Sequence, residues 1–438
     1  MRWPRRASGW NRQKEGRILP GEGYSRKREQ GWRRVSPYFS ANGKRLVPRE
    51  GSPGGRDFIR GPVAQKGSGN TGAKGKEFAK RICVYGRRGK AMRFRVGIIG
   101  IGSIVEEVHL PVLAKRKDVI LAAVCDVNEE RLKEISRKYA VPKSYRDGLE
   151  MIAREKLDAV VICTPNSAHI PYAAAAAAKG IHIFLEKPIG VNPQEAEDMI
   201  RTAGQNRAIV MVGMVSRFRR DVQIAKEYIE SGMPGDIYYV KAQLLRRRGT
   251  PKGWFTDRSF SGGGVLMDIG VHILDAAWWL LGCPRPQRIS GHAVQALGNY
   301  ETRFLSSWKS SGETVKSVHD VEDFAAGWIR FENGTVLALE TSWALNGKQD
   351  EGLSMQIYGT KGGISLPPLT LYREERRILS EIHPQFEENH PYEEEFQHFF
   401  ECIRKGKTPV ADGVQGLRVL EMIRALYESA GQGRELSL

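Results

Sequence analysis

Apolar residues from residue 93 onward come in short runs that polar stretches separate. Apolar runs of this length are typical of strands that are buried on both faces of a parallel sheet. They predict strands at 94–99, 119–125, 157–163, 181–185 and 209–215, with a weaker strand at 141–145. Helical stretches lie between them, at Asn128–Tyr139, His169–Lys179 and Pro193–Asn206. The alternation predicts an α/β domain over residues 92–213, a doubly wound parallel sheet with its ligand crevice at the carboxyl ends of the strands.

The pattern changes near residue 214, where strands begin to follow one another without intervening helices. Strand-like runs occur at 237–245, 288–296, 323–331, 335–344 and 353–359, with turns at Asn333-Gly334 and Lys361-Gly362-Gly363. Helices are predicted near Val222–Ser231, at Tyr392–Arg404 and at Gly413–Ser429. Residues 214–438 are therefore predicted to form an α+β domain with an open, mostly antiparallel sheet.

One predicted helix, which follows the glycines at 262–264, separates apolar from acid and base side chains. At 100° per residue, Asp268, His272 and Asp275 fall within about 60° of one another. A different side carries the residues that would pack into the core, which are Leu266, Ile269, Ile273, Ala277 and Leu280. The glycines have no Cβ and allow another backbone or a ligand to come close. This arrangement favours an enzyme.

The net charge of +18 resides in residues 1–91, which hold 24 Lys and Arg against six Asp and Glu, so the rest of the chain is neutral. These residues show no sustained period and are predicted to be a disordered basic extension. Met92 directly precedes the first strand, as an authentic start codon would, so we interpret the extension as dispensable or as lying upstream of the true start. A polyanion-binding arm and a transit segment are the alternatives. No nucleic-acid partner is expected for the neutral body.

The five cysteines form no CxxC pair and lie at no metal-ligand spacing from histidines, so neither a zinc site nor a disulfide framework is expected. This usage indicates a reduced, cytoplasmic compartment. The sequence has no run of 18 apolar residues, and no membrane span is expected.

Gly100-Ile101-Gly102 follows the first strand and opens a helix that begins with Ser103 and Ile104. In that context the glycines predict a tight turn, which lets backbone N–H groups reach a pyrophosphate. The third fingerprint position, normally Gly or Ala, is Val105. Asp126 lies at the end of the next strand, where a carboxylate would bind a ribose diol. No Arg follows Asp126 directly, so a Rossmann domain that binds NAD rather than NADP is predicted.

Thr164-Pro165-Asn166 closes the fourth strand, and His169 follows. A strand end of this kind is where the nicotinamide or its ribose would lie, so we predict that these residues contact the cofactor. Asn166 and His169 have an alternative role, because either side chain could cap the helix that follows.

Together with Glu186-Lys187-Pro188 and the Asp268-x-x-x-His272 helix, these motifs resemble the Gfo/Idh/MocA oxidoreductases over residues 93–438. The resemblance implies hydride transfer between a nicotinamide and a hydroxyl or carbonyl carbon of a sugar, cyclitol or related polyol. It implies that Lys187 is the catalytic lysine, that Lys187 and His272 are the acid/base groups, and that Asp268 orients the reacting hydroxyl. Glu186 is expected on the cofactor side. It also implies a homo-oligomer, a dimer or tetramer, with the open sheet as the interface.

Two other functions remain open. One is a redox-neutral, NAD-retaining glycosidase of the same family, and the other is a non-catalytic nucleotide-binding regulator. Arg217 and Trp254 are predicted to line the substrate. Asp275 is left out of the catalytic set, because it could simply bond a neighbouring backbone.

Overall fold

The computed structural model describes residues 93–298, 300, 318–347 and 351–438. All of them belong to one compact unit within residues 71–438. The predicted disordered extension lies outside the described residues.

The first sheet is parallel throughout and has the strand order β3-β2-β1-β4-β5-β6. Its strands are β1 (Phe94–Ile99), β2 (Val119–Cys125), β3 (Ser144–Tyr145), β4 (Ala159–Ile162), β5 (His182–Leu185) and β6 (Val210–Val212). Each lies within a predicted run, and the weak run contains the two-residue edge strand β3. The order reverses between β1 and β4, so the doubly wound prediction is confirmed.

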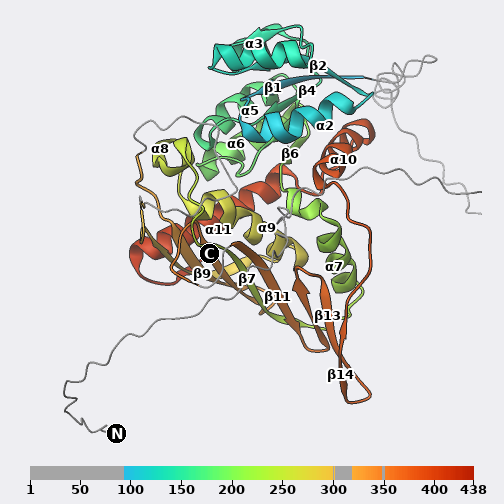
Figure 1. The fold of residues 1–438 in the computed structure, drawn as a ribbon, viewed down its shortest axis with the longest axis vertical. Helices are drawn as coiled ribbons and strands as arrows, with labels where there is room; N and C mark the ends of the chain where they lie inside the picture. Colours follow the sequence, from blue (N-terminus) through green and yellow to red (C-terminus); the bar gives the residue numbers. More distant parts are fainter. Residues whose placement is uncertain (1–92, 299, 301–317, 348–350) are drawn as a thin grey trace, which may run out of the picture. The chain divides into compact units, whose positions relative to one another are not determined.

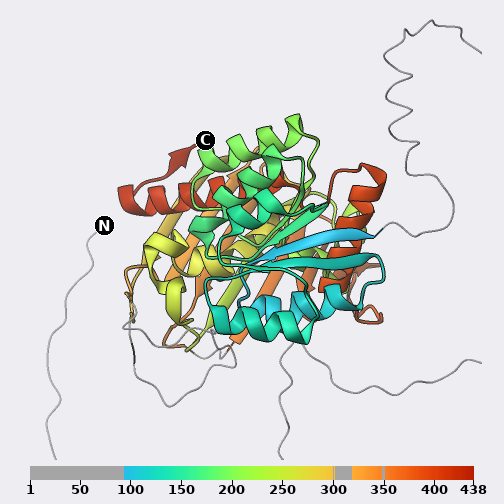
Figure 2. The ribbon, with the colours of Figure 1, turned by 90° about the horizontal axis from the view of Figure 1, so that it is seen from above.

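Helices cover both faces of this sheet (Figure 2). A π-helical turn, Val105–His109, leads into α2 (Leu110–Lys115), which packs on one face with α3 (Glu129–Lys138). The other face carries α4 (Gly148–Arg154), α5 (His169–Ala178) and α6 (Pro193–Gln205). The first face is completed from the far end of the chain by α10 (Pro391–Lys405), where Phe396 stacks on Phe184 at 4.6 Å. The carboxyl-terminal half of the chain is therefore part of the core of this sheet.

The second sheet has nine strands in the order β14-β13-β12-β11-β7-β10-β9-β8-β15. The predicted runs correspond to β7 (Ile237–Arg246), β8 (Pro286–Val294), β9 (Phe324–Phe331), β10 (Val336–Ser342) and β11 (Glu351–Gly359). Among the described strands of this second sheet, only β7 and β10 pair in parallel. The sheet is therefore mostly antiparallel, as predicted.

Four strands were not predicted: β12 (Gly362–Leu366), β13 (Thr370–Glu375), β14 (Ile378–Ile382) and β15 (Leu436–Ser437). The predicted turn at Lys361-Gly362-Gly363 is wrong in part, because both glycines belong to β12. Gly362 is needed for sheet packing, since a Cβ there would lie 2.7 Å from the Tyr372 carbonyl oxygen. The turn at Asn333-Gly334 is present, and Gly334 adopts a φ of +84°.

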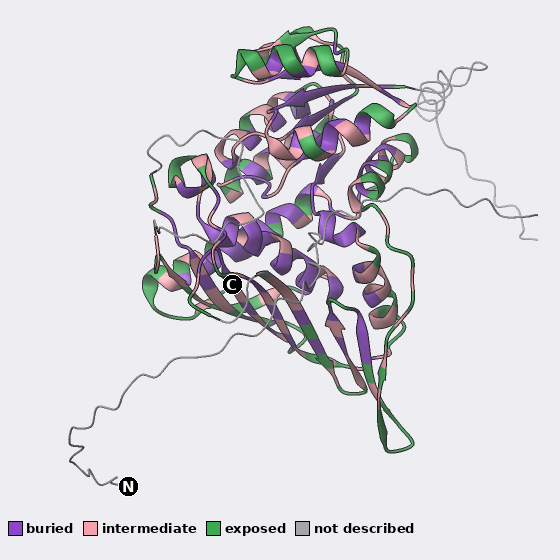
Figure 3. Cartoon of the chain, viewed as in Figure 1, coloured by how far each residue is buried: buried purple, intermediate pink, exposed green. Residues whose placement is uncertain are grey.

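Three helices pack on one face of the second sheet: α7 (Arg220–Glu230), α9 (Val271–Leu280) and α11 (Gly413–Gln432). Helix α11 also contacts α6 and β6, so it joins the two sheets (Figure 1). Figure 3 shows that α9 and α11 are largely buried between them. On the opposite face of the second sheet, Trp328 is 45% exposed and Tyr358 is 39% exposed.

Candidate active site

Lys187 and Asp268 lie in direct contact although 81 residues separate them. Lys187 follows the carboxyl end of β5, and Asp268 lies in a π-helical turn, Leu266–Gly270, that precedes α9. The Lys187 Nζ donates to the Asp268 carbonyl oxygen at 2.8 Å and to its Oδ1 at 3.3 Å. Both side chains are mostly buried, at 17% and 13% exposure. The contact joins the end of the parallel sheet to the start of α9.

The second carboxylate oxygen of Asp268 is also bonded. Its Oδ2 accepts from the indole Nε1 of Trp343 at 3.0 Å, and Trp343 is fully buried. Burial raises the pKa of Asp268, but the positive charges of Lys187 and Arg246 and the Trp343 hydrogen bond outweigh burial and lower it. Asp268 is therefore ionised at neutral pH.

His272 lies in the first turn of α9, next to this pair. Burial, together with the positive charge of Lys187, lowers the pKa of His272 to about 3. Its Nδ1 is buried and has no hydrogen-bond partner in the described part of the chain. The imidazole is thus neutral at neutral pH, and one of its ring nitrogens can accept a hydrogen bond.

Arg217, which was predicted to line the substrate, is instead found in a buried ion pair. It lies in the 3-10 helix Val215–Phe218, its side chain is fully buried, and it binds both carboxylate oxygens of Asp275 at 2.9 and 2.5 Å. Its Nη1 donates to the Val410 carbonyl oxygen and to Gln415. Asp275 is accordingly a partner in a buried ion pair on α9, whereas Lys187 contacts Asp268 in the π-helical turn before α9. The sequence analysis placed Asp268, His272 and Asp275 together because it assumed one regular α-helix. In the structure Asp268 lies in a π-helical turn that precedes α9.

The close approach that the glycine triplet permits is to another part of the protein. Gly262 ends α8 (Arg258–Ser261) with a φ of +75°. A Cβ on Gly264 would lie 2.0 Å from the carbonyl oxygen of Glu322. The Glu322 carboxylate accepts from the N–H groups of Gly264 and Leu266 and from the Tyr427 hydroxyl. This network determines where the turn that carries Asp268 begins.

The Gly100-Ile101-Gly102 turn lies at the carboxyl end of β1, beside β2 and β4. Gly100 has a φ of +83°, and a Cβ there would lie 2.6 Å from the Cys163 carbonyl oxygen. At Gly102 a Cβ would meet nothing within 4 Å, so the backbone borders open space, as a pyrophosphate would need. Ile104 precedes the π-helical turn Val105–His109 without a side-chain cap, and the N–H groups of Val105 and Glu106 donate to the Gly102 carbonyl oxygen.

Asp126 bonds the glycine turn itself. Its Oδ2 accepts from the Ile101 N–H at 2.7 Å, and its Oδ1 accepts from the Asn128 N–H at 2.9 Å. Each carboxylate oxygen can accept a further bond, so a ribose diol remains possible. Arg131, which the sequence reasoning missed, donates from Nη1 to the Ile101 carbonyl oxygen at 2.8 Å.

The side chains that follow β4 bond other parts of the protein, and neither Asn166 nor His169 caps the helix that follows. Asn166 Nδ2 donates to the Ser261 carbonyl oxygen at 2.8 Å, which ties this strand end to α8. The two ring nitrogens of His169 lie 2.8 and 2.9 Å from the carbonyl oxygens of Pro188 and Thr164. Helix α5 and the 3-10 turn before it have no side-chain cap. The buried Thr164 Oγ1 has no partner among the described residues.

His109 and Trp343 are the clearest residues that the sequence reasoning missed. His109 Nε2 lies 2.7 Å from Glu186 Oε1, and Glu186 Oε2 accepts from the Lys187 N–H at 3.1 Å. A histidine inside the apolar stretch that leads into α2 was the available signal. Trp254, by contrast, stacks on Phe255 with ring centroids 4.0 Å apart, and its place beside the substrate stays a prediction.

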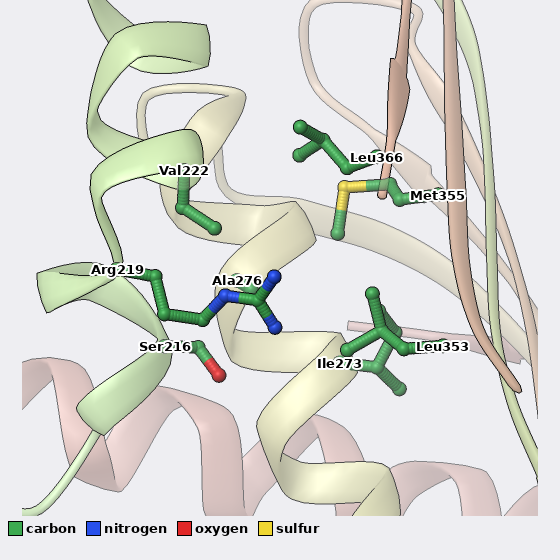
Figure 4. Close-up of a pocket in the computed structure, with 8 residues that line it drawn as sticks. All are labelled: Ser216, Arg219, Val222, Ile273, Ala276, Leu353, Met355 and Leu366. Atoms are coloured by element: carbon green, nitrogen blue, oxygen red, sulfur yellow. The ribbon is translucent and has the colours of Figure 1, made fainter. Parts of the chain in front are cut away.

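A small apolar cavity lies away from these residues, between α7, α9 and the second sheet (Figure 4). Its volume of about 10 Å³ is near the minimum for one water molecule, so it is not a substrate site. Its lining residues are Ser216, Arg219, Val222, Ile273, Ala276, Leu353, Met355 and Leu366. Over the described ranges, no cluster of three His, Cys, Asp or Glu side chains could hold a metal ion. Within the same ranges, no helix has the length and apolarity to span a bilayer.

Comparisons with known proteins agree with this architecture. Two family models match, "Oxidoreductase family, NAD-binding Rossmann fold" over residues 94–214 and "Oxidoreductase family, C-terminal alpha/beta domain" over residues 226–438. The D-glucoside 3-dehydrogenase of Escherichia coli (strain K12) is 32% identical over 347 residues, which cover 78% of this chain and 97% of that relative. The myo-inositol 2-dehydrogenase of Thermotoga maritima is 27% identical over 78% of this chain and 98% of its own length.

Among solved structures, the aldose-aldose oxidoreductase from Caulobacter crescentus aligns with a TM-score of 0.67 at 25% identity. The alignment covers 79% of this chain and the whole of that one. The named relatives are dehydrogenases of sugar and cyclitol hydroxyls, and this chain is likewise an oxidoreductase. The chain belongs to the Gfo/Idh/MocA family of oxidoreductases, with an NAD-binding Rossmann domain and the family's C-terminal α/β domain.

Proposed function

We propose that this oxidoreductase is an NAD-dependent dehydrogenase whose catalytic residues are Lys187, Asp268 and His272. The observation that carries the proposal is the bonded contact between Lys187 and Asp268, with His272 in the next turn. A cation, a carboxylate and a neutral imidazole at one strand end are the groups that oxidation of an alcohol requires.

In the oxidation, a C–H and an O–H bond of the substrate break and a C=O bond forms. When bound, NAD would supply the acceptor for the hydride that leaves the carbinol carbon. The Lys187 ammonium stabilises negative charge that develops on the oxygen. The ionised Asp268 holds the Lys187 ammonium and, through it, orients the substrate oxygen. The neutral His272 accepts the O–H hydrogen bond and takes up that proton as the hydride leaves carbon. In the reductive direction the same groups act in reverse.

The turn at Gly100 and Gly102 would hold the pyrophosphate, together with the amides of Ser103 and Ile104. Asp126 would bind the adenosine ribose, and its carboxylate would repel the 2′-phosphate of NADP. This charge supports NAD as the preferred cofactor. The strand end at 164–166 and Glu186 would flank the nicotinamide side. An unpartnered Thr164 hydroxyl is consistent with a ligand at that end.

The substrate class is a sugar, a cyclitol or a related polyol. D-Glucosides are the first compounds to test, since the D-glucoside 3-dehydrogenase shares 32% identity. The assay uses the full chain with NAD or NADP and follows near-ultraviolet absorbance of the reduced nicotinamide across glucosides, aldoses and inositols. Reduction of NAD with one of them is the expected result. Product formation without NADH accumulation would instead indicate the redox-neutral glycosidase, and binding of NAD without turnover would indicate the regulator.

The catalytic assignment is tested with Lys187→Ala, which should abolish turnover but retain NAD binding. Lys115→Ala is the matched control, because that side chain is 74% exposed on α2 and should leave turnover unchanged. Wild-type turnover in Lys187→Ala would refute the assignment.

We also propose that the enzyme is a homo-oligomer, a dimer or tetramer, which pairs through the uncovered face of the second sheet. Tyr239, Trp328 and Tyr358 form an aromatic row there, with centroids 5.7 and 5.8 Å apart. Exposed aromatic residues in a continuous row are typical of protein interfaces. Light scattering of the wild type and of Trp328→Glu would test this, and an unchanged molecular mass in the variant would contradict it.

A further inference from the structure

His109 is linked to Lys187 through Glu186 and takes no part in the proposed chemistry. It ends the π-helical turn Val105–His109, and its side chain is fully buried. Its ring lies edge-on to those of Phe396 and Phe184, with centroids 5.2 and 5.8 Å away. Placing a polar imidazole among aromatic rings costs free energy unless it is hydrogen-bonded. The position therefore calls for an explanation beyond packing.

The hydrogen bonds of His109 lead directly to Lys187. Its Nε2 lies 2.7 Å from Glu186 Oε1, while Glu186 Oε2 accepts the backbone N–H of Lys187 at 3.1 Å. Burial raises the pKa of Glu186, but the hydrogen bond from His109 and the charge of Lys187 outweigh burial and lower it. Glu186 is thus an ionised acceptor, so His109 Nε2 is the donor in their contact. Bonds to an ionised group are stronger than bonds between neutral groups.

Glu186 is also confined sterically. A Cβ on Gly213 would come within 3.3 Å of its carboxylate, so β6 closes one side while His109 closes another. The Glu186 backbone N–H donates to the Ile162 carbonyl oxygen at 2.9 Å, which anchors the residue at the sheet end. With the carboxylate held in this way, the backbone of Lys187 is held as well. The Lys187 side chain therefore extends from a fixed backbone position to the contact between its Nζ and Asp268.

We infer that His109 is a positioning residue for the catalytic site: by holding Glu186, it orients the Lys187 backbone and so the contact between Lys187 and Asp268. The inference rests on the proposed catalytic role of Lys187. His109 touches neither Lys187 Nζ nor Asp268 in the described contacts, so it acts through Glu186 alone.

The test compares His109→Leu, which removes the donor, with His109→Gln, which keeps an N–H near the Nε2 position. We expect His109→Leu to lower kcat by about tenfold or more with little change in NAD affinity, because a bond to a charged group is lost. His109→Gln should recover most of the activity. Thermal unfolding of each variant confirms that the measured protein is folded.

A double-mutant cycle with Glu186→Gln separates positioning from general stability. If His109 acts through Glu186, adding His109→Leu to Glu186→Gln should lower kcat little further. His182→Leu is the matched control: the His182 side chain is hydrogen-bonded too, accepting the Ile209 backbone N–H at 3.0 Å, but it lies at the opposite end of β5 from Lys187. It should lower stability without lowering kcat.

Wild-type kcat in folded His109→Leu would overturn the inference, as would fully additive losses in the cycle. Equal losses in His109→Gln and His109→Leu would also contradict it. Lys187→Ala, measured alongside, keeps the two proposals apart. If Lys187→Ala retains turnover, the proposed function fails, whereas if only the His109 variants retain it, the positioning role fails.

Discussion

Glu395→Gln replaces a buried acid with a neutral side chain of nearly the same shape. Glu395 lies on α10 and is 1% exposed, and neither of its carboxyl oxygens has a partner in the described part of the chain. Burial raises the pKa of Glu395 well above its usual value, and the negative charges of Glu186 and Asp275 raise it further. The folded enzyme therefore favours the protonated form of Glu395.

The unfolded chain releases this proton near the ordinary value of 4.5, whereas the folded chain retains it. Above that pH the unfolded state binds fewer protons, so the free energy of unfolding falls by about 1.4 kcal/mol for each pH unit. The fall continues until the pH reaches the folded-state pKa. Below the ordinary value both states are protonated and Glu395 carries no such penalty.

The assay is chemical denaturation of the wild type and of Glu395→Gln between pH 4.5 and 8. We expect the two to converge at the acid end and the variant to be increasingly the more stable as pH rises. Glu394→Gln, an exposed neighbour on the same helix, is the control and should follow the wild type. A difference between wild type and Glu395→Gln that is constant over this range would refute the reasoning.

Three further substitutions test the site and its support. Arg217→Met should cost about 3–5 kcal/mol of unfolding free energy, because it leaves Asp275 as a buried unpaired charge, and a denaturation curve measures this loss. Gly264→Ala should destabilise the enzyme or prevent folding, since its Cβ would lie 2.0 Å from a carbonyl oxygen, whereas soluble protein with wild-type thermal stability would contradict this. Trp343→Phe removes the hydrogen bond that lowers the pKa of Asp268, so the acid limb of the pH–rate profile should move to higher pH. An unmoved limb would indicate that Asp268 does not control that limb.

Runs of apolar residues predicted much of the fold, because burial of a strand on both faces depends on the residues of that strand itself. A strand buried on both faces needs consecutive apolar residues, and β2 and β4 show them without interruption. Strands β12 to β15 were missed because they are short and partly exposed, so apolar runs do not mark them. Their pairing depends on partners elsewhere in the sheet.

Neighbouring residues and their spacing were enough to predict the α/β architecture, the glycine turn and the residue types proposed for hydride transfer. Which side chains meet depends on how distant segments pack. The tertiary structure brings Lys187 into contact with Asp268, Asp275 with Arg217, and His109 with Glu186. The physical reason is that such contacts arise where separate strand ends and helices converge. Helical spacing describes one helix and does not say which segments of the chain pack against each of its faces.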